Sequence, residues 1–471
     1  MITTPNIVYV IVHDLGRHLG CYGIPVASPN IDAFASEATL FRNAFCSAPA
    51  CSPSRACAMT GQYSHVNGTI GLAHQGWPLR DDKKTVVDYL NEGGYQTLHF
   101  GLSHDRQPLQ NHYQVDSERN WEDRYNTRRA FDKALAFMEA RQDGDQPFYM
   151  NIGVTNPHAS MWSGNHPYAD HGDPVPPDQV YVPPYLPDTP GTRESLGRFQ
   201  AAIRFLDLEF GRFMEKADAL GQGKDTIFIF TVDHGAHTGW RRDKMMCYDK
   251  GVEIALIVRM PDGVGEGRVV DDLIPNIDYA PTVLDLAGLP IPDDMNGRTV
   301  KSLLFDDGSY QPHDAIFIER NFHGPFDPVR CVRTRDYHYM RNYRPEAIDY
   351  LPLPFELPAG YRDEDKESLP AKPRPQEELY HLRTDPMEFI NLAHRPEFAS
   401  VRDGLVGRME QWMRETDDFL LRGEEPEPHA EEGFLGWEPA DTIASGNVRA
   451  HASPFQSRAI TYKLTKVLPG I

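Results

Sequence analysis

The sequence of 471 residues contains no apolar run near the ~18–20 residues that a membrane-spanning helix needs, so no membrane partner is expected. Cations are also scarce: 47 Lys and Arg stand against 68 Asp and Glu, a net charge of −21. Because phosphate contacts need clustered Lys and Arg, this balance argues against nucleic-acid binding. The six cysteines lack paired metal-finger spacing and the density of a disulfide scaffold. The remaining composition, 40% hydrophobic and 24% charged, is typical of a soluble globular protein.

The N-terminus also lacks the pattern of a secretion signal. No basic segment is followed by an apolar stretch of the required kind, and the one nearby apolar run, at 7–12, is typical of a strand. The chain as given is therefore expected to be cytoplasmic, or periplasmic if a leader was removed.

Strands and helices alternate along the first two thirds of the chain. Apolar, β-rich runs predict buried strands at 7–12, 95–101, 147–154, 226–232 and 254–258. Apolar residues at helical spacing predict helices at 30–38, with Asn30 as N-cap, and at 85–92, 128–140 and 193–219. This alternation predicts the α/β class, with a large, doubly wound, mostly parallel sheet flanked by helices.

The composition changes near Ser309. Beyond it, segments 315–319 and 329–343 predict antiparallel strands. We therefore expect a catalytic α/β domain over residues 1–308 and a smaller C-terminal α+β subdomain, carrying an antiparallel sheet, over residues 309–471.

Polar side chains follow four of the predicted strands. They are His13 and Asp14, His104, His158, and Asp233 with His234. Taken singly, such an Asp is better explained as a helix cap, and such a His is better explained as a buried core residue with its hydrogen bonds satisfied. Ligand sites of α/β sheets collect at the carboxyl ends of the strands, so the recurrence at four strand ends favours one shared site.

Cys51-Ser52-Pro53-Ser54-Arg55 precedes a helix-compatible stretch that runs to Gly61. The thiol is therefore expected at or near a helix start, where free backbone N–H groups favour an anion. A lone cysteine would be better explained as a buried apolar residue. The whole string, however, resembles the type I sulfatase signature C-x-P-S-R-x-x-x-[LM]-T-G of the alkaline phosphatase superfamily. In that family a formylglycine-generating enzyme oxidises the cysteine to formylglycine, whose hydrated aldehyde is the nucleophile.

Other stretches resemble the same family. Asp14 matches the second acidic residue of its D-D-x-G motif, although His13 stands at the first, and Asp233-His234-Gly235 resembles its D-[NH]-G pair. His104 matches the histidine of G-K-x-H, with Leu102 in place of the lysine. These departures bring the chain nearest to the branch that includes heparan N-sulfatases. The resemblance extends to the substrate-side histidine, His158, and to a basic sulfate-binding residue, Lys244.

The resemblance implies roles for these residues. Catalysis would involve Cys51, Arg55, His104, His158 and Lys244, and substrate would be bound by Lys244, His158 and Arg242. A divalent metal, calcium in most of the family, would be held by Asp14, Asp233, His234, Cys51 and His13. Such a cation neutralises sulfate oxygens and acidifies a nucleophile. Two imidazoles make the site softer, so manganese and zinc stay open.

The expected function is hydrolysis of a sulfate ester or sulfamate on a small or carbohydrate substrate. Phosphonate monoester or phosphodiester hydrolysis is the alternative within the superfamily, because it uses the same nucleophile position and often an Asp–His pair. A non-catalytic binding protein of the same fold is the alternative from another class, which the departures at His13 and Leu102 favour. The sequence does not predict the substrate or the oligomeric state.

Overall fold

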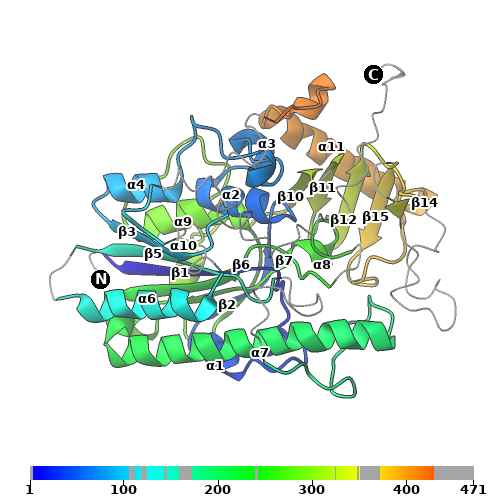
Figure 1. Cartoon of the computed structure of the whole chain (residues 1–471). Coiled ribbons are helices and arrows are strands. Elements are labelled where there is room, and N and C mark those ends of the chain that lie inside the picture. The colour runs from blue at the N-terminus through cyan, green and yellow to red at the C-terminus, as the bar shows by residue number, and fades with distance from the viewer. Residues whose placement is uncertain are drawn as a thin grey trace, which may run out of the picture.

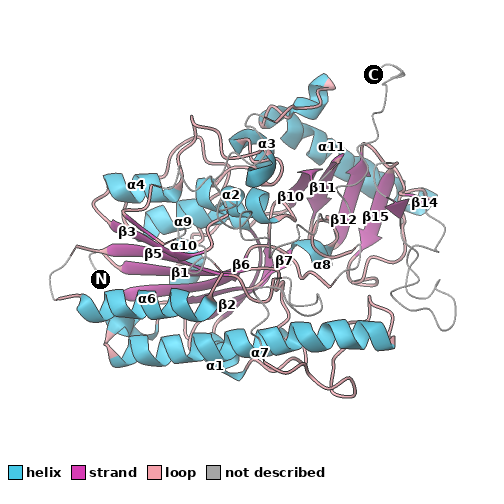
Figure 2. Cartoon of the chain, viewed as in Figure 1, coloured by secondary structure: helices cyan, strands magenta, loops and turns pink. Residues whose placement is uncertain are grey.

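The computed structural model describes residues 4–104, 112–117, 125–142, 146–158, 172–238, 242–323, 325–346, 349–350 and 372–428. Two groups of strands are visible, a large sheet between two layers of helices and a smaller sheet on one side of it (Figures 1 and 2). This arrangement confirms the predicted fold class.

The large sheet has nine strands in the order β4-β3-β5-β1-β6-β8-β2-β7, and β9 pairs with β2. Their bounds are β1 Asn6–Val12, β2 Thr39–Phe45, β3 Gln96–Gly101, β4 Val115–Asp116, β5 Phe148–Val154, β6 Thr226–Val232, β7 Glu253–Ile254, β8 Leu256–Arg259 and β9 Val269–Pro275. From β4 to β6 all neighbours are parallel, and β8 is antiparallel to β6. In β1, β5 and β6 every residue is buried, as expected for strands covered on both faces.

The register of the central strands aligns their carboxyl ends. Val12, the last residue of β1, lies opposite Val154 of β5 and Val232 of β6. The residues that follow these three strands therefore emerge at one edge of the sheet, where ligand sites of α/β folds lie.

Helices cover both faces of the large sheet. α6 and α7 pack together on one face with α1, and α2, α4, α9 and α10 lie on the other (Figure 1). Their bounds are α1 Pro29–Ser36, α2 Cys51–Thr60, α4 Val86–Glu92, α6 Thr127–Ala140, α7 Pro190–Ala219, α9 Tyr279–Leu286 and α10 Lys301–Phe305, with the shorter α3 Ser64–Asn67 and α8 Asp249–Val252. Within the described ranges, no helix combines the length and the apolar character needed to cross a bilayer.

The smaller sheet is antiparallel, in the order β10-β11-β12-β15, and α11 packs on it. Its elements are β10 Ile316–Phe322, β11 Phe326–Arg333, β12 Tyr337–Asn342, β15 Glu377–His381 and α11 Ala399–Glu415; β13 Asp349–Tyr350 and β14 Lys372–Pro373 form a separate pair. The antiparallel strands expected at 315–319 and 329–343 are confirmed, and within the second segment β11 and β12 pair with each other.

Two sequence predictions are corrected. Asn30 is not the N-cap of α1, which is Ser28. Instead, the Asp207 carboxylate of α7 accepts hydrogen bonds from the backbone N–H groups of Asn30 and Ile31, so the helix end is satisfied from a neighbouring helix. The strand expected at 254–258 is split into β7 and β8, which pair with different parts of the sheet.

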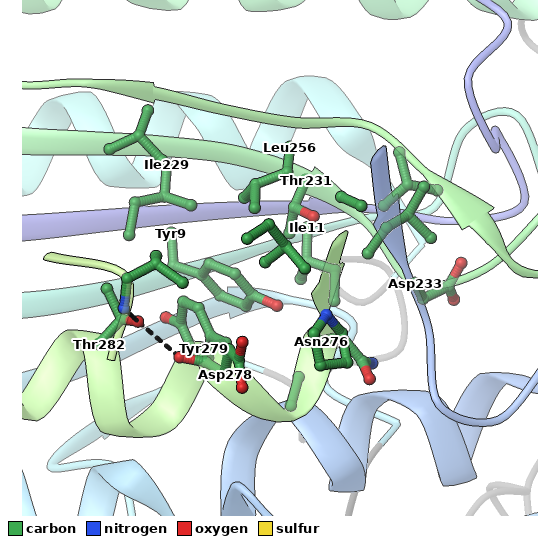
Figure 3. A pocket seen from close by; sticks show the side chains of 18 of the residues that line it. Tyr9, Ile11, Ile229, Thr231, Asp233, Leu256, Asn276, Asp278, Tyr279 and Thr282 are labelled. Atoms are coloured by element: carbon green, nitrogen blue, oxygen red, sulfur yellow. Dashed lines mark hydrogen bonds between the residues drawn. The ribbon is translucent and has the colours of Figure 1, made fainter. Parts of the chain in front are cut away.

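An internal pocket lies between the large sheet and α9. Its lining is mostly apolar and includes Tyr9, Ile229 and Tyr279 (Figure 3). Asp233 and Thr231 lie at the end nearest the carboxyl ends of the strands. The pocket belongs to the packing beneath that edge, where the hydroxyl groups of Tyr149 and Tyr279 are 2.8 Å apart.

Candidate active site

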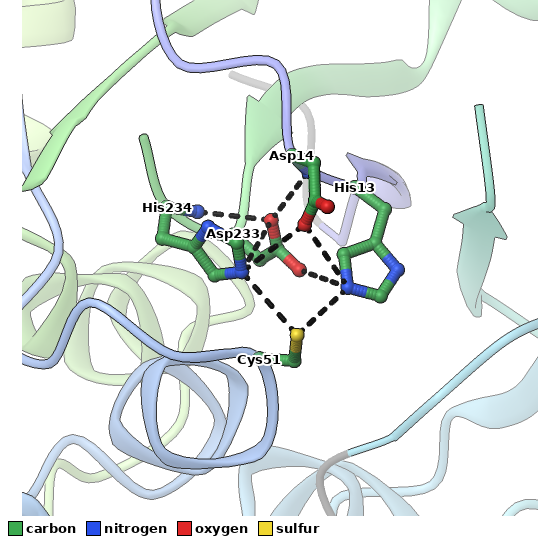
Figure 4. A group of neighbouring side chains, drawn as sticks. All are labelled: His13, Asp14, Cys51, Asp233 and His234. Carbon is green, nitrogen blue, oxygen red and sulfur yellow. Dashed lines mark hydrogen bonds and ion pairs between the residues drawn. The ribbon is translucent and has the colours of Figure 1, made fainter. Parts of the chain in front are cut away.

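Five polar side chains converge at the carboxyl edge of the large sheet (Figure 4). His13 and Asp14 follow β1, Asp233 and His234 follow β6, and Cys51 begins α2. Because β1 and β6 are neighbouring parallel strands, the two acidic residues meet, and the backbone N–H of Asp14 donates to Oδ1 of Asp233 at 3.0 Å. All five side chains are buried.

Cys51 is held at the first position of a helix that is buried along its whole length. The backbone N–H of Ser54 donates to the carbonyl of Ala50 at 2.8 Å, which closes the first turn. The Ser54 hydroxyl donates to the backbone carbonyl of Asp233, and Asn276 Nδ2 donates to the Ser54 carbonyl at 2.9 Å. The start of α2 is thereby tied to the end of β6, and Cys51 is only 3% exposed.

Two imidazoles face the thiol and the carboxylates. Nε2 of His13 lies 3.0 Å from Sγ of Cys51 and 3.2 Å from Oδ2 of Asp233. Nε2 of His234 lies 3.4 Å from the same sulfur and 3.3 Å from Oδ1 of Asp14. One donor atom from each of the five residues lies within 4.8 Å of all the others, a spacing that a single ion could bridge.

The chemistry of these donor atoms fits a divalent cation. Nδ1 of His234 lies 2.9 Å from the backbone carbonyl of Gly235, which can only accept, so the proton sits on Nδ1 and the Nε2 lone pair faces the cluster. The carboxylates of Asp14 and Asp233 supply the negative charge. The two Asp and two His side chains, with residue 51, are therefore the group that could hold a metal.

Two buried cations also contact the carboxylates. Nζ of Lys244 lies 2.8 and 2.9 Å from the two oxygens of Asp14. Nε of Arg55 donates to Oδ2 of Asp233 at 3.1 Å, and its Nη1 donates to the carbonyl of Leu102 at 3.1 Å. The side chain of Leu102 is itself buried. Arg55 and Lys244 therefore give this edge of the sheet a pair of fixed positive charges.

Further histidines surround the cluster. Nδ1 of His158 lies 2.6 Å from Oδ2 of Asp14, and its ring stacks on that of His13 at 4.2 Å. His104 is buried, has φ of 59°, and its ring centroid is 5.8 Å from that of His13. His237, which the sequence did not single out, places Nδ1 3.5 Å from Asp14 Oδ2. The feature of the sequence that could have identified His237 is its position two residues after the Asp233-His234-Gly235 motif.

Burial and charge shift the protonation of these groups. Burial lowers the pKa of His13 and of His158, so both imidazoles are neutral near pH 7. Although burial acts to raise the pKa of Asp14, the Lys244 ammonium and neighbouring imidazoles hold it well below its usual range. Burial raises the pKa of the Cys51 thiol to about 12, against the opposing effect of Lys244. The unmodified thiol is thus a poor nucleophile at neutral pH.

Arg242 lies apart from these contacts. It donates to the backbone carbonyl of Glu388, and its guanidinium lies over the ring of Tyr248 at 4.3 Å and near that of Phe389. It is buried against the C-terminal part of the chain. The structure thus brings together all the predicted site residues except Arg242, whose assignment to substrate stays a prediction.

Two family models match the chain. The sulfatase model matches residues 5–289, and the model for the C-terminal region of N-sulphoglucosamine sulphohydrolase matches residues 235–374. The first covers more than half of the chain and includes all five cluster residues.

Individual proteins are similar over most of the chain. An ulvan-active sulfatase of Formosa agariphila is 27% identical, over 88% of this chain and 81% of its own. Human N-sulphoglucosamine sulphohydrolase is 25% identical, over 88% of this chain and 90% of its own. The solved structure of BT4656 with its substrate D-glucosamine-2-N,6-O-disulfate has a TM-score of 0.69 and 20% identity, covering 88% of this chain and 98% of that one. This last likeness concerns the fold.

Proposed function

Since the chain belongs to the sulfatase family, we propose that it hydrolyses a sulfate ester or sulfamate on a saccharide, with residue 51 as formylglycine. The observation that carries the proposal is the position of Cys51: it begins α2, and its sulfur lies 3.0 Å from one of the imidazoles that face two carboxylates. The sulfated saccharides named for two relatives, ulvan and N-sulphoglucosamine, support the substrate class.

The cation site would serve this reaction directly. A divalent cation held by Asp14, Asp233, His234 and His13 would neutralise sulfate oxygens and lower the pKa of the hydroxyl at residue 51. Calcium is the cation implied by the family resemblance. Residue 51 itself has to be oxidised by a formylglycine-generating enzyme, because a thiol with one acidic proton cannot perform the second elimination step of the cycle.

The side chains around residue 51 suit the proton transfers of the two halves of the reaction. In the first half, the ionised hydroxyl oxygen of residue 51 forms a bond to sulfur while the bond from sulfur to the leaving oxygen or nitrogen breaks. His158 is neutral in the free protein, and it becomes the acid for that leaving group when the bound anionic sulfate favours a second proton on the ring. Asp14 then holds Nδ1–H, and Nε2–H is the proton that is delivered. Lys244, whose pKa Asp14 raises despite burial, stays charged and stabilises the sulfate.

In the second half, His104 takes the proton of the remaining hydroxyl at residue 51. The bond between carbon and the sulfate oxygen breaks, sulfate leaves, and the aldehyde returns for hydration by water. Burial lowers the pKa of His104 well below its usual value, so its imidazole is neutral and able to accept this proton. Arg55 orients residue 51 through its position at the same helix start, where its planar donors suit Asp233 better than a lysine would.

The test combines mass analysis with substrate panels. The protein is produced with a formylglycine-generating enzyme, and the peptide that carries residue 51 is examined for an aldehyde in place of the thiol. Turnover is then measured on sulfated monosaccharides and disaccharides, including N-sulfated glucosamine. Cys51→Ala should abolish turnover, and Cys21→Ala, a change at a partly exposed cysteine that is not a member of the cluster, should leave it unchanged. Full turnover with an intact thiol at position 51 would contradict the proposal.

Phosphonate monoester or phosphodiester hydrolysis is the second candidate. The observation that favours it is the buried Asp233–His234 pair, because the phosphonate and phosphodiester hydrolases of the superfamily often have an Asp–His pair. Parallel assays with an aryl sulfate and an aryl phosphonate monoester separate the two, because the preferred ester should show the higher kcat/KM. Cation binding without turnover on either ester would instead indicate a binding protein. For the domain organisation we propose units at residues 1–308 and 309–471.

A further inference from the structure

We propose that the cation site of this chain selects a late first-row transition metal such as zinc over calcium, because His13 and His234 direct imidazole nitrogens into it. The inference rests on the proposed function, which requires a divalent cation beside residue 51. It concerns the identity of that cation.

The side chains of the cluster offer few oxygen atoms as metal ligands. Calcium takes about six to eight oxygen ligands, largely carboxylates and carbonyls. Among the described residues of the cluster, Asp14 and Asp233 alone supply carboxylate oxygens, while His13 and His234 supply nitrogen. Residue 51 supplies a sulfur as cysteine and would supply an oxygen as formylglycine, which still leaves two of the five donors as nitrogen. Imidazole nitrogen suits zinc, iron, nickel and copper, and contributes little to a calcium site.

The two carboxylates are also already engaged by cations. Lys244 Nζ contacts both oxygens of Asp14, and Arg55 Nε contacts Oδ2 of Asp233. The fixed charge of the carboxylates is therefore balanced before any metal binds. A hard cation that depends on anionic oxygen gains less in such a site than a metal that forms bonds to neutral nitrogen.

Both imidazoles are oriented for ligation. Nε2 of His13 points at the same small volume as Sγ of Cys51 and Oδ2 of Asp233, at 3.0 and 3.2 Å (Figure 4). Nε2 of His234 is left as the unprotonated nitrogen by the Nδ1 contact with the Gly235 carbonyl. In the structure without a metal, the same His13 nitrogen is within hydrogen-bonding distance of the thiol and the Asp233 carboxylate, and a bound metal would replace these contacts.

A second buried group of similar residues provides a contrast. Asp249, His338 and Glu388 also place donor atoms within 4.8 Å of one another. There, however, Arg333 donates from Nε and Nη2 to the two oxygens of Asp249 at 3.1 and 3.0 Å, in the bidentate geometry of a structural ion pair. The Arg333 guanidinium therefore already occupies the Asp249 carboxylate, and we assign no metal to this group.

The experiment uses the full chain with Cys51→Ser, which removes both the thiolate and any formylglycine from the measurement. Calorimetric titrations of the chelator-treated protein are run with Zn²⁺ alone and with Ca²⁺ alone. We expect Zn²⁺ to bind at least about tenfold more tightly than Ca²⁺. Adding His13→Asp should weaken Zn²⁺ binding by about 10–100-fold and strengthen Ca²⁺ binding. His394→Asp, the same change at an exposed histidine, should alter neither affinity.

A second measurement decides the matter even if the His13 variant does not fold. Mn²⁺ bound to the Cys51→Ser chain should show, by pulsed electron paramagnetic resonance, nitrogen couplings from two coordinated imidazoles. Tighter binding of Ca²⁺ than of Zn²⁺, or Mn²⁺ without imidazole nitrogen couplings, would overturn the inference. Turnover is not read here, so failure to hydrolyse sulfate esters would refute the proposed function and leave the metal preference standing.

Discussion

Replacing Lys244 by methionine should destabilise the metal-free protein far more than an equivalent change at a partly exposed lysine. Lys244 is buried, and its Nζ contacts both oxygens of Asp14 at 2.8 and 2.9 Å. Methionine keeps most of the apolar stem and removes the charge, so the Asp14 carboxylate remains buried without its main cationic partner. The matched control is Lys250→Met, since Nζ of the partly exposed Lys250 lies 2.8 Å from the Glu253 carboxylate.

The expected magnitude follows from burial. Removing one partner of a buried ion pair costs about 3–5 kcal/mol of unfolding free energy, and the remaining contact with His158 places Lys244→Met near the lower end. The Lys250→Met change should cost less, because Lys250 is partly exposed and Arg17 still contacts the Glu253 carboxylate after the lysine charge is removed. The Asp14 carboxylate raises the pKa of Lys244 although burial opposes it. The contribution is therefore complete below the unfolded pKa of 10.5 and disappears only at higher pH.

Urea unfolding of chelator-treated protein, followed by circular dichroism, measures both variants. The gap between Lys244→Met and Lys250→Met should be the same at pH 7 and pH 9, because both lie below that pKa. Saturation with a divalent cation should narrow the difference in unfolding free energy between the two variants, because the cation then balances the charge of the Asp14 carboxylate. Equal stability of the two variants, or a gap that closes between pH 7 and pH 9, would refute the assignment of Lys244 as the partner of Asp14.

Three other changes test separate parts of the structure. Arg55→Lys should lower kcat by about 10²-fold or more with a smaller effect on KM, because the planar donors to Asp233 and Leu102 are lost; steady-state kinetics would disprove the role if kcat were unchanged. His158→Gln should slow substrates with poor leaving groups more than activated aryl sulfates, and equal losses on both would argue against it as the acid. Burial lowers the pKa of His18 to about 4 from 6.5, so unfolding free energy should fall by roughly 3 kcal/mol as pH drops across that interval. His18→Gln should reduce this slope in urea titrations, and an unaltered slope would contradict the reasoning.

The strands that carry the site could be predicted because their signal is strong. β1, β5 and β6 are continuous apolar runs, and the residues that follow them emerge at one edge by the geometry of parallel pairing. β2 and β9 were missed because Arg42 and Asn43, and Asp271 and Asp272, interrupt their apolar pattern. Those polar side chains are exposed or half-exposed in strands near the end of the sheet, where alternation is weak.

The contacts within the site were harder to predict than its members. The motif at Cys51 and the strand ends indicated which residues to examine, and spacing alone could not show that Lys244 reaches Asp14 from 230 positions away. The same limit explains Arg242, which lies two residues before Lys244 yet contacts Glu388 and Tyr248. Neighbouring residues on an irregular loop diverge, because their directions depend on tertiary packing.

The complete burial of α2 constrains when residue 51 can be modified during biosynthesis. A modifying enzyme needs an extended, accessible segment, whereas here all ten residues of the helix are enclosed and Ser54 is fastened to the end of β6. The proposed oxidation of residue 51 would therefore have to precede folding of this segment, as the chain leaves the ribosome or is held unfolded. Protein that folds first retains a sealed thiol, and adding the modifying enzyme to purified material will not activate it.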